Sequence, residues 1–205
     1  MTVEVVVFDI GNVLIEWQPE TFFTRRVGKP RSDAFFATVP IHDIHQSVDD
    51  GAAFDVILAA AKTYPEFEPE LRIWHDQWED LTANVISHSV RLMAALQSRS
   101  IPVWALTNFG VEPFERSCVA HPFLNDFDGA VVSGQVKLSK PNPAIYQVME
   151  GRLGVPPASI LFVDDRMENI HAAVARGWKT HHFNGADTWA QTLVDYGLLT
   201  KEEAI

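Results

Sequence analysis

The sequence predicts an α/β protein with a doubly wound, Rossmann-like parallel sheet and a helical subdomain inserted after the first strand. Two observations predict this fold. Short apolar runs rich in β-branched residues alternate with helical segments along most of the chain, which is typical of a parallel sheet covered by helices on both faces. Residues 16–86 interrupt this alternation, because they are rich in helix-forming residues throughout.

The strands are expected where the apolar character is nearly continuous. The first covers residues 3–8 and ends at the polar, turn-forming run Asp9-Ile10-Gly11-Asn12. Four more are expected, at 102–106, 128–133, 160–163 and 179–183. The helices that alternate with them are expected at about 112–120, 142–152, 167–176 and 186–196. Pro143 suits a helix start and Gly154 lies just past a helix end, which supports the second of these helices.

The region from 16 to 86 is expected to be entirely helical. Its clearest helical pieces are residues 51–62 and 71–78. One helical face collects the apolar residues Leu71, Trp74, Trp78 and Leu81. A helix at 87–98 is expected to return the chain to the sheet. The sequence therefore predicts a catalytic core made of residues 1–15 and 87–205 and a helical cap made of residues 16–86.

Composition excludes several classes of protein. The chain has 16 Lys and Arg against 27 Asp and Glu, a net charge of −11, so a basic face that binds nucleic acid is not expected. The single cysteine, Cys118, excludes an internal disulfide framework and a cysteine-rich zinc site. The start lacks the pattern of a signal peptide, and no apolar stretch approaches the roughly 20 residues that span a bilayer. We therefore expect a soluble, cytoplasmic protein without nucleic-acid or membrane partners; no feature indicates its oligomeric state.

Chemically active side chains follow the predicted strands. Open α/β sheets bind ligands at the carboxyl ends of their strands, so the residues directly after each strand are site candidates. The first strand leads to Asp9, the second to Thr107-Asn108, the loop after the third to Lys140, and the fourth to Asp164-Asp165. Three carboxylates, one hydroxyl and one ammonium group are therefore expected at one edge of the sheet.

These groups match the requirements of phosphoryl transfer through a covalent intermediate. A carboxylate can attack phosphorus to form an acyl phosphate, which water then hydrolyses. Attack by one anion on another needs a cation between them, and Mg²⁺ takes its ligands from carboxylates, carbonyl groups and water. Thr107, an adjacent backbone N–H and Lys140 could donate hydrogen bonds to the oxygens of the transferred group.

Four short motifs in order resemble those of the haloacid dehalogenase-like hydrolase superfamily. They are residues 8–14 (FDIGNVL), 106–108 (LTN), 140–143 (KPNP) and 162–165 (FVDD). The resemblance covers nearly the whole core, about 1–15 and 87–195, and the helical region after the first motif corresponds to the family's cap. The FDIGNV form is similar to that of bacterial sugar-phosphate phosphatases, the α-D-glucose-1-phosphate phosphatase-like members among them.

The resemblance implies a role for each candidate residue. Asp9 would be the nucleophile, and Mg²⁺ would be held by Asp9, the carbonyl of Gly11, Asp164 and Asp165. Thr107, Asn108 and Lys140 would bind the phosphoryl group, with Thr107 and Lys140 also counted as catalytic. Asn169 would orient the aspartate loop from behind. The implied activity is Mg²⁺-dependent hydrolysis of a small phosphorylated metabolite.

Gly11 departs from the pattern of most phosphatases of the family. They carry a second aspartate two residues after the nucleophile, where it protonates the leaving group and then activates water. Either a cap residue such as Asp50 or His45 replaces this acid, or the enzyme prefers substrates whose leaving group needs little help. An acid of this kind contributes about 10²–10⁴ in rate.

Two other functions share these motifs. An L-2-haloacid dehalogenase uses the same nucleophile without a metal, but such enzymes carry an aromatic residue at the position of Gly11 and a fourth motif rich in serine and asparagine. The Asp164-Asp165 pair therefore favours the phosphatase. The alternative of a non-catalytic phosphate-binding pseudoenzyme is not excluded, because Gly11 already stands where most phosphatases of the family have a catalytic carboxylate.

The absence of a carboxylate at Gly11 leads to a first prediction about substrates. A sugar 1-phosphate leaves as an anomeric hydroxyl, which is more acidic than an ordinary alcohol and needs less protonation. Hexose 1-phosphates should therefore be hydrolysed with a higher kcat/KM than the matching 6-phosphates. Side-by-side kinetics on glucose 1-phosphate and glucose 6-phosphate check this; equal values, or a preference for the 6-phosphate, would mean that another residue supplies the acid.

Overall fold

Five parallel strands form one sheet in the computed structural model, which describes residues 2–205. Their order across the sheet is β3-β2-β1-β4-β5. The strands are β1 Val5–Phe8, β2 Val103–Thr107, β3 Gly129–Val132, β4 Ile160–Asp164 and β5 Lys179–His182. The predicted fold class is confirmed. Because β2 and β4 each extend one residue further than predicted, Thr107 and Asp164 are the last residues of strands rather than the first residues of loops.

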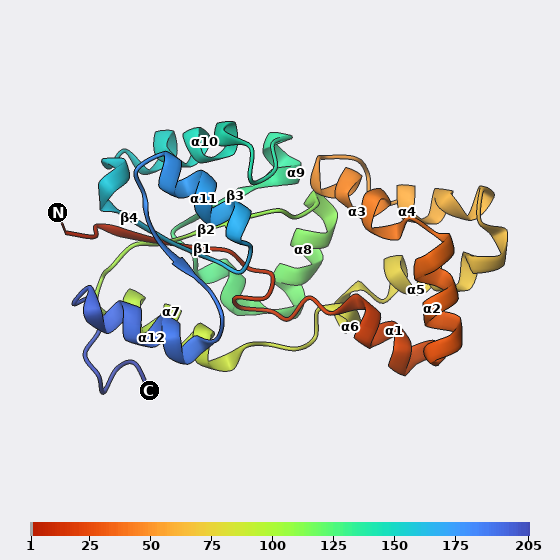
Figure 1. The fold of residues 1–205 in the computed structure, drawn as a ribbon, viewed down its shortest axis with the longest axis horizontal. Helices are drawn as coiled ribbons and strands as arrows, with labels where there is room; N and C mark the ends of the chain where they lie inside the picture. The colour runs from red at the N-terminus through yellow and green to blue at the C-terminus, as the bar shows by residue number, and fades with distance from the viewer. Residues whose placement is uncertain (1) are drawn as a thin grey trace.

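Helices cover both faces of this sheet (Figure 1). One face packs against α7 Ser87–Ser98, α8 Val111–Ala120 and α12 Ala186–Asp195. The other face packs against α10 Pro143–Leu153 and α11 Met167–Ala175. Short helices occupy three of the connections: η3 Pro122–Asp126, α9 Ser133–Val136 and η4 Pro157–Ser159. The helix α9 takes Ser133 out of the predicted third strand, so this residue begins a helix instead.

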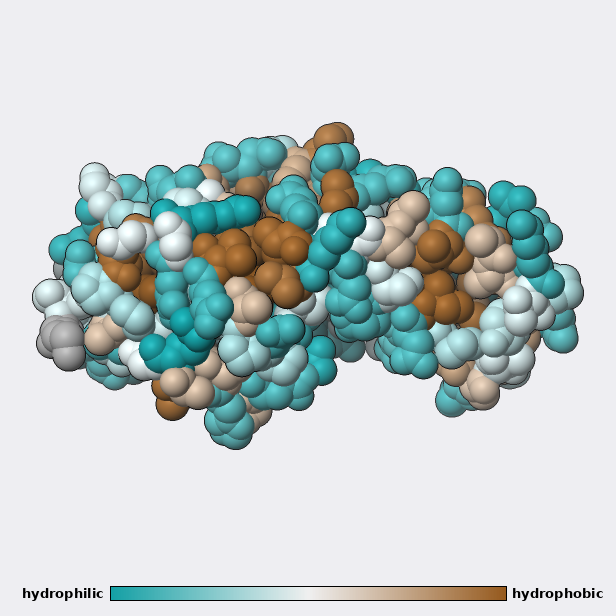
Figure 2. Space-filling view, turned by 90° about the horizontal axis from the view of Figure 1, so that it is seen from above, coloured by the Kyte–Doolittle hydropathy of each residue, from teal (hydrophilic) through white to brown (hydrophobic). Residues whose placement is uncertain are grey.

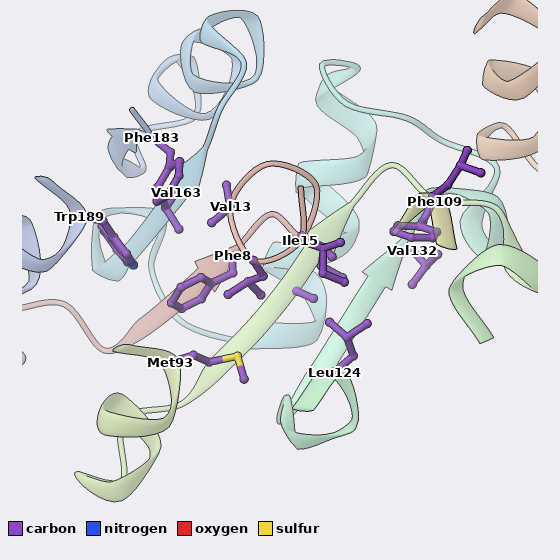
Figure 3. Close-up of a cluster of buried hydrophobic side chains, with 14 of the residues drawn as sticks. Phe8, Val13, Ile15, Met93, Phe109, Leu124, Val132, Val163, Phe183 and Trp189 are labelled. Atoms are coloured by element: carbon purple, nitrogen blue, oxygen red, sulfur yellow. The ribbon is translucent and has the colours of Figure 1, made fainter. Parts of the chain in front are cut away.

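The sheet is buried on both faces because the side chains of β1 alternate between two hydrophobic clusters. Phe8 points into the cluster that contains Met93 and Trp189 (Figure 3). Val7 belongs to the opposite cluster, which contains Tyr146. Both β1 side chains are fully buried. A strand covered on both sides must be apolar at every position, which is why the first strand reads as a continuous apolar run.

Between β1 and α7 the elements are helices, apart from isolated β-bridges that join Ile15 to Gly11 and to Val85, and we call residues 16–86 the helical insertion. It lies at one end of the molecule (Figure 1), and the outline narrows where it meets the lobe that contains the sheet (Figure 2). Its helices are α1 Pro19–Val27, α2 Lys29–Thr38, α3 Ile41–Asp49, α4 Val56–Ala59, η1 Ala60–Lys62, η2 Pro65–Phe67, α5 Glu68–Asp76 and α6 Trp78–Leu81. The division into a core of 1–15 and 87–205 and a cap of 16–86 stays a prediction.

Two helices of the insertion differ in their bounds from those that the sequence predicts. The predicted helix at 51–62 begins only at Val56, because Gly51 has a φ of +104° and adopts a conformation that a helix does not allow. The predicted helix at 71–78 is divided at Gln77. There Arg116 of α8 donates hydrogen bonds to the carbonyl groups of His75 and Asp76, at 2.8 and 3.2 Å, which takes over acceptors that a continuous helix would use.

Among the described residues, the structure has no helix with the length and apolar character that crossing a bilayer requires.

Candidate active site

The register between β1 and β4 brings the first two carboxylates together. Phe8 pairs with Val163, and the backbone N–H of Asp9 donates to the carbonyl of Val163 at 2.9 Å. The next residues of the two chains, Asp9 and Asp164, therefore lie side by side at the carboxyl end of the sheet. With Asp165 they form a cluster in which one oxygen from each carboxylate lies within 4.8 Å of the others.

Lys140 lies between two of these carboxylates and is buried. Its Nζ is 2.9 Å from Oδ1 of Asp9 and 2.6 Å from Oδ2 of Asp164. Burial alone would lower the pKa of Lys140, but the carboxylates of Asp164 and Asp9 outweigh it and hold this pKa above its ordinary value. Asn108 fixes the backbone of Lys140, since its side chain donates to the Lys140 carbonyl at 3.0 Å and accepts from the Lys140 N–H at 2.8 Å.

Both oxygens of Asp164 are occupied by hydrogen bonds. Besides Lys140, they accept from the amide of Asn169, at 2.9 and 3.0 Å, and from the backbone N–H of Arg166 at 2.8 Å. Asp164 is completely buried, so these bonds replace all of its contacts with water. Asp164 therefore positions Lys140, while Asp9 and Asp165 retain oxygens that can bind other groups.

Asp9 has one oxygen fixed and one without a partner. Its Oδ1 accepts from the backbone N–H of Ile10 at 2.7 Å and faces Lys140, and no hydrogen bond to Oδ2 occurs within residues 2–205. Burial raises the pKa of Asp9 to about 7, Lys140 opposes this rise, and Asp164 and Asp165 add to it. The cluster thus holds more negative charge than Lys140 can balance.

Asp165, the third carboxylate of the cluster, also has a raised pKa. Burial raises its pKa, although the side chain of Asn12 donates to Oδ2 of Asp165 at 2.9 Å and opposes the rise. Asn12 also accepts from the backbone N–H of Trp17 at 2.9 Å, and its φ of 54° places it in the left-handed region that asparagine tolerates. The sequence analysis assigned no role to Asn12, although it lies inside the first motif.

A pocket of about 150 Å³ opens above the carboxylates, between the sheet and the helical insertion. The predicted site residues that line it are Asp9, Gly11, Asn108, Lys140, Asp165 and Asn169. Thr107 is not among the lining residues; it is buried at the end of β2. A Cβ atom at Gly11 would meet nothing within 4 Å, so this side of the pocket has room for a longer side chain.

The helical insertion contributes an aromatic wall to the pocket. The ring of His45 stacks against both Trp17 and Trp78, and the three ring centroids lie 5.3 Å from one another. Nε1 of Trp74 donates to Nδ1 of His45 at 3.2 Å, so that nitrogen carries no proton. Burial lowers the pKa of His45 to about 3, and the ring is therefore neutral at pH 7.

Asp49 is a second titratable residue of this wall that the sequence analysis missed. It is the last residue of α3 and lines the pocket, whereas its neighbour Asp50 is exposed and accepts hydrogen bonds from Ser139 and Gln46. Burial raises the pKa of Asp49 to about 7. A pair of adjacent aspartates at a helix end is an ordinary surface pattern, so only the packing of the insertion distinguishes the two.

A family model described as haloacid dehalogenase-like hydrolase matches residues 3–177. The chain belongs to the haloacid dehalogenase-like (HAD) hydrolases. The resemblance seen in the four motifs is confirmed at the level of the family, and the protein is a hydrolase.

The curated relatives of this HAD hydrolase are phosphatases of different kinds. Flavin mononucleotide hydrolase 1 from Arabidopsis thaliana is 39% identical, but the match covers only 29% of this chain and 24% of that protein. A phosphorylated carbohydrates phosphatase from Thermotoga maritima is 23% identical over 85% of this chain and 82% of its own length. The chain thus spans about a quarter of the first relative and most of the second.

Solved structures share the fold of this HAD hydrolase. A HAD family enzyme from Bacteroides thetaiotaomicron superimposes with a TM-score of 0.70 at 19% identity, covering 94% of this chain and 99% of that one. The same enzyme has been solved in complex with magnesium and inorganic phosphate. An L-2-haloacid dehalogenase from Xanthobacter autotrophicus reaches a TM-score of 0.66 at 19% identity, covering 97% and 85% of the two chains. Such identities show a common fold.

The raised pKa of Asp49 predicts how this HAD hydrolase responds to pH. Between about pH 4 and pH 7 the folded protein keeps a proton on Asp49 that the unfolded chain releases, so the free energy of unfolding falls as pH rises through this window. Asp49→Asn removes this loss. The free energy of unfolding of the variant minus that of the wild type should therefore be about 2–4 kcal/mol larger at pH 8 than at pH 4. This range follows from roughly 1.4 kcal/mol per unit of pKa.

Urea unfolding of both proteins at the two pH values measures this difference. Asp50→Asn is the matched control, because it makes the same chemical change at the exposed neighbouring residue. The groups facing Asp49 are neutral His45, Asp50 and the N–H of Gly110. An equal effect of Asp49→Asn at pH 4 and pH 8 would contradict the raised pKa.

Proposed function

We propose that the protein is a Mg²⁺-dependent phosphatase that hydrolyses a small phosphorylated metabolite, such as a sugar phosphate, through an aspartyl-phosphate at Asp9. The observation that carries this proposal is the state of Asp9, with one oxygen fixed by Ile10 and Lys140 and the other free at the floor of the pocket. The pocket volume of about 150 Å³ is below the roughly 300–1,000 Å³ of most ligand sites, which favours a small substrate. The cytoplasmic location stays a prediction.

The residues of the cluster fit a divalent cation. When all three carboxylates are ionised they carry −3 against +1 on Lys140, an excess charge of −2 that Mg²⁺ would balance. The donors are all oxygen atoms, which Mg²⁺ prefers over nitrogen and sulfur. We assign Asp9, Asp165 and the carbonyl of Gly11 as its ligands, and Asp164 as the residue that supports them. A bound Mg²⁺ would supply positive charge between the phosphoryl group and the attacking carboxylate.

The side chains of the protein then have separate tasks. The free oxygen of Asp9 attacks phosphorus, and water later hydrolyses the acyl phosphate that forms. The ammonium group of Lys140 has three donors, of which two face Asp9 and Asp164, so one remains for an oxygen of the phosphoryl group. Asn108 holds the backbone of Lys140 in place, and we keep Thr107 and Asn108 as candidate contacts of the phosphoryl group.

The carboxylate cluster favours a phosphatase over the alternative of a dehalogenase. Displacement of halide from carbon needs one nucleophilic carboxylate and no cation. In this chain, Asp165 adds a second carboxylate with a raised pKa beside Asp9, and its negative charge would oppose the approach of an anionic haloacid. The two adjacent carboxylates can serve a reaction of an anionic substrate when a bound cation neutralises their charge.

Asp9→Asn tests the nucleophile. An amide cannot form the acyl phosphate, so kcat for p-nitrophenyl phosphate with Mg²⁺ should fall by about 10⁴-fold or more. The fold should persist, as judged by circular dichroism and the melting temperature, and Asp50→Asn should keep wild-type activity. Near-normal turnover by Asp9→Asn would exclude this mechanism, and a wild-type protein without turnover would favour the pseudoenzyme.

Removal of the metal tests the cation. Excess EDTA should abolish turnover, and added Mg²⁺ should restore it, because the excess negative charge at Asp9 otherwise repels the phosphate. Asp165→Asn should raise the Mg²⁺ concentration needed for half-maximal activity by at least about tenfold. Activity that is undiminished in EDTA would contradict the metal-dependent mechanism.

A further inference from the structure

Asp49 brings a carboxyl group of the helical insertion to the pocket that contains Asp9. Its side chain is 13% exposed, and its Oδ1 is buried without a hydrogen-bond partner among residues 2–205. A buried polar atom without a partner costs free energy. A group of this kind in the pocket that contains the proposed nucleophile is therefore a candidate for a role in the reaction.

The backbone of Asp49 is fixed against the core by contacts that do not involve Oδ1 of its carboxyl group. Oγ of Ser133 donates to the Asp49 carbonyl at 2.6 Å and accepts from the N–H of Phe109 at 2.8 Å. The insertion can come this close because Gly110 has no side chain, since a Cβ there would lie 2.4 Å from Cγ1 of Val48. The position of Asp49 relative to Asp9 is therefore defined by the contact between insertion and core.

The two residues that the sequence suggested as replacement acids do not fit this task. His45 is neutral, its Nδ1 accepts a hydrogen bond from Trp74, and its ring packs against two further tryptophans. Its Nε2 is 3.8 Å from Oδ1 of Asp49, too far for a hydrogen bond. Asp50 is exposed, does not line the pocket, and is bonded to Ser139 instead.

The electrostatic surroundings of Asp49 favour its protonated form near neutral pH. Burial raises its pKa to about 7, the N–H of Gly110 opposes this rise, and Asp50 adds to it. The other charged residues that line the pocket are Asp9, Glu16, Lys140, Asp165 and Arg166. A carboxyl group that titrates near the working pH can both donate and accept a proton in the course of one reaction.

We propose that Asp49 is the general acid and base of the hydrolysis, in place of a carboxylate at position 11; this inference rests on the proposed function. As an oxygen of Asp9 bonds to phosphorus, the bond from phosphorus to the leaving oxygen breaks, and the proton of Asp49 moves to that oxygen. The leaving group departs as an alcohol. Asp49 then takes a proton from water as the water oxygen bonds to phosphorus, the bond to Asp9 breaks, and inorganic phosphate is released.

The dependence of rate on the leaving group tests this assignment. Phenyl phosphate and p-nitrophenyl phosphate are similar in shape, but only the phenolate of the first is basic enough to need a proton as it departs. Asp49→Asn should lower kcat/KM by about 10²-fold for phenyl phosphate and by less than about tenfold for p-nitrophenyl phosphate. With Asp49 as the acid, the preference for glucose 1-phosphate over glucose 6-phosphate that Gly11 alone predicts is replaced by a weak preference in the wild type and a pronounced one in this variant.

Two further variants separate protonation from a structural effect. Asp50→Asn makes the same chemical change one residue away and should leave both aryl phosphates at wild-type rates. Gly11→Asp, added to Asp49→Asn, places a carboxyl group where the pocket has room and should raise kcat/KM for phenyl phosphate by at least about tenfold. An equal increase for both aryl phosphates would contradict a role in protonation.

The pH profile and the ratio of losses decide the outcome. In the wild type, kcat/KM for phenyl phosphate should decline as pH rises above about 7, because Asp49 loses its proton, and this decline should be absent in Asp49→Asn. Equal losses for the two aryl phosphates, or an unchanged pH profile, would overturn the assignment of Asp49. A wild-type protein without Mg²⁺-dependent turnover of p-nitrophenyl phosphate would overturn the proposed function itself.

Discussion

The buried ammonium group of Lys140 between Asp9 and Asp164 is the interaction on which the rest of the site depends. An ammonium group moved out of water loses several kcal/mol of solvation, which only close and well-oriented carboxylates offset. This requirement explains the surrounding structure. Asn108 fixes the backbone of Lys140, Asn169 fixes Asp164, and the register of β1 against β4 sets the two carboxylates side by side.

The cluster has more carboxylate groups than ammonium groups, which is the imbalance that binding a cation requires. Burial raises the pKa of Asp9 and of Asp165, and the neighbouring carboxylates of the cluster add to both rises. An unbalanced buried charge weakens the fold, since protonation or a cation must compensate for it. Residues chosen only for stability would not include Asp165, which is why the imbalance points to a cation and an anionic substrate.

The contact between the helical insertion and the core decides what else the pocket contains. Ser133 and Gly110 let the end of α3 come against the loop after β2, and this approach buries Asp49 while it leaves Asp50 in water. The aromatic residues of the insertion exclude water from the same place and keep His45 neutral. Two neighbouring aspartates thereby differ in burial, and burial raises the pKa of Asp49.

The sequence alone determined the parallel sheet, the order of its main elements, the family and the residues at the strand ends. It could do so because a strand buried on both faces must be apolar throughout, and because ligands of such sheets collect where the strands end. Asp9, Lys140 and the Asp164-Asp165 pair could be found in this way.

The sequence could not separate Asp164 from Asp165. The oxygens of Asp164 are all engaged by Lys140, Asn169 and Arg166, whereas Asp165 lines the pocket. The sequence also could not distinguish Asp49 from Asp50, and it could not predict that the helix is interrupted at Gln77. Those distinctions depend on contacts between segments far apart in the chain, and no local pattern of residues encodes which side chain such a contact buries.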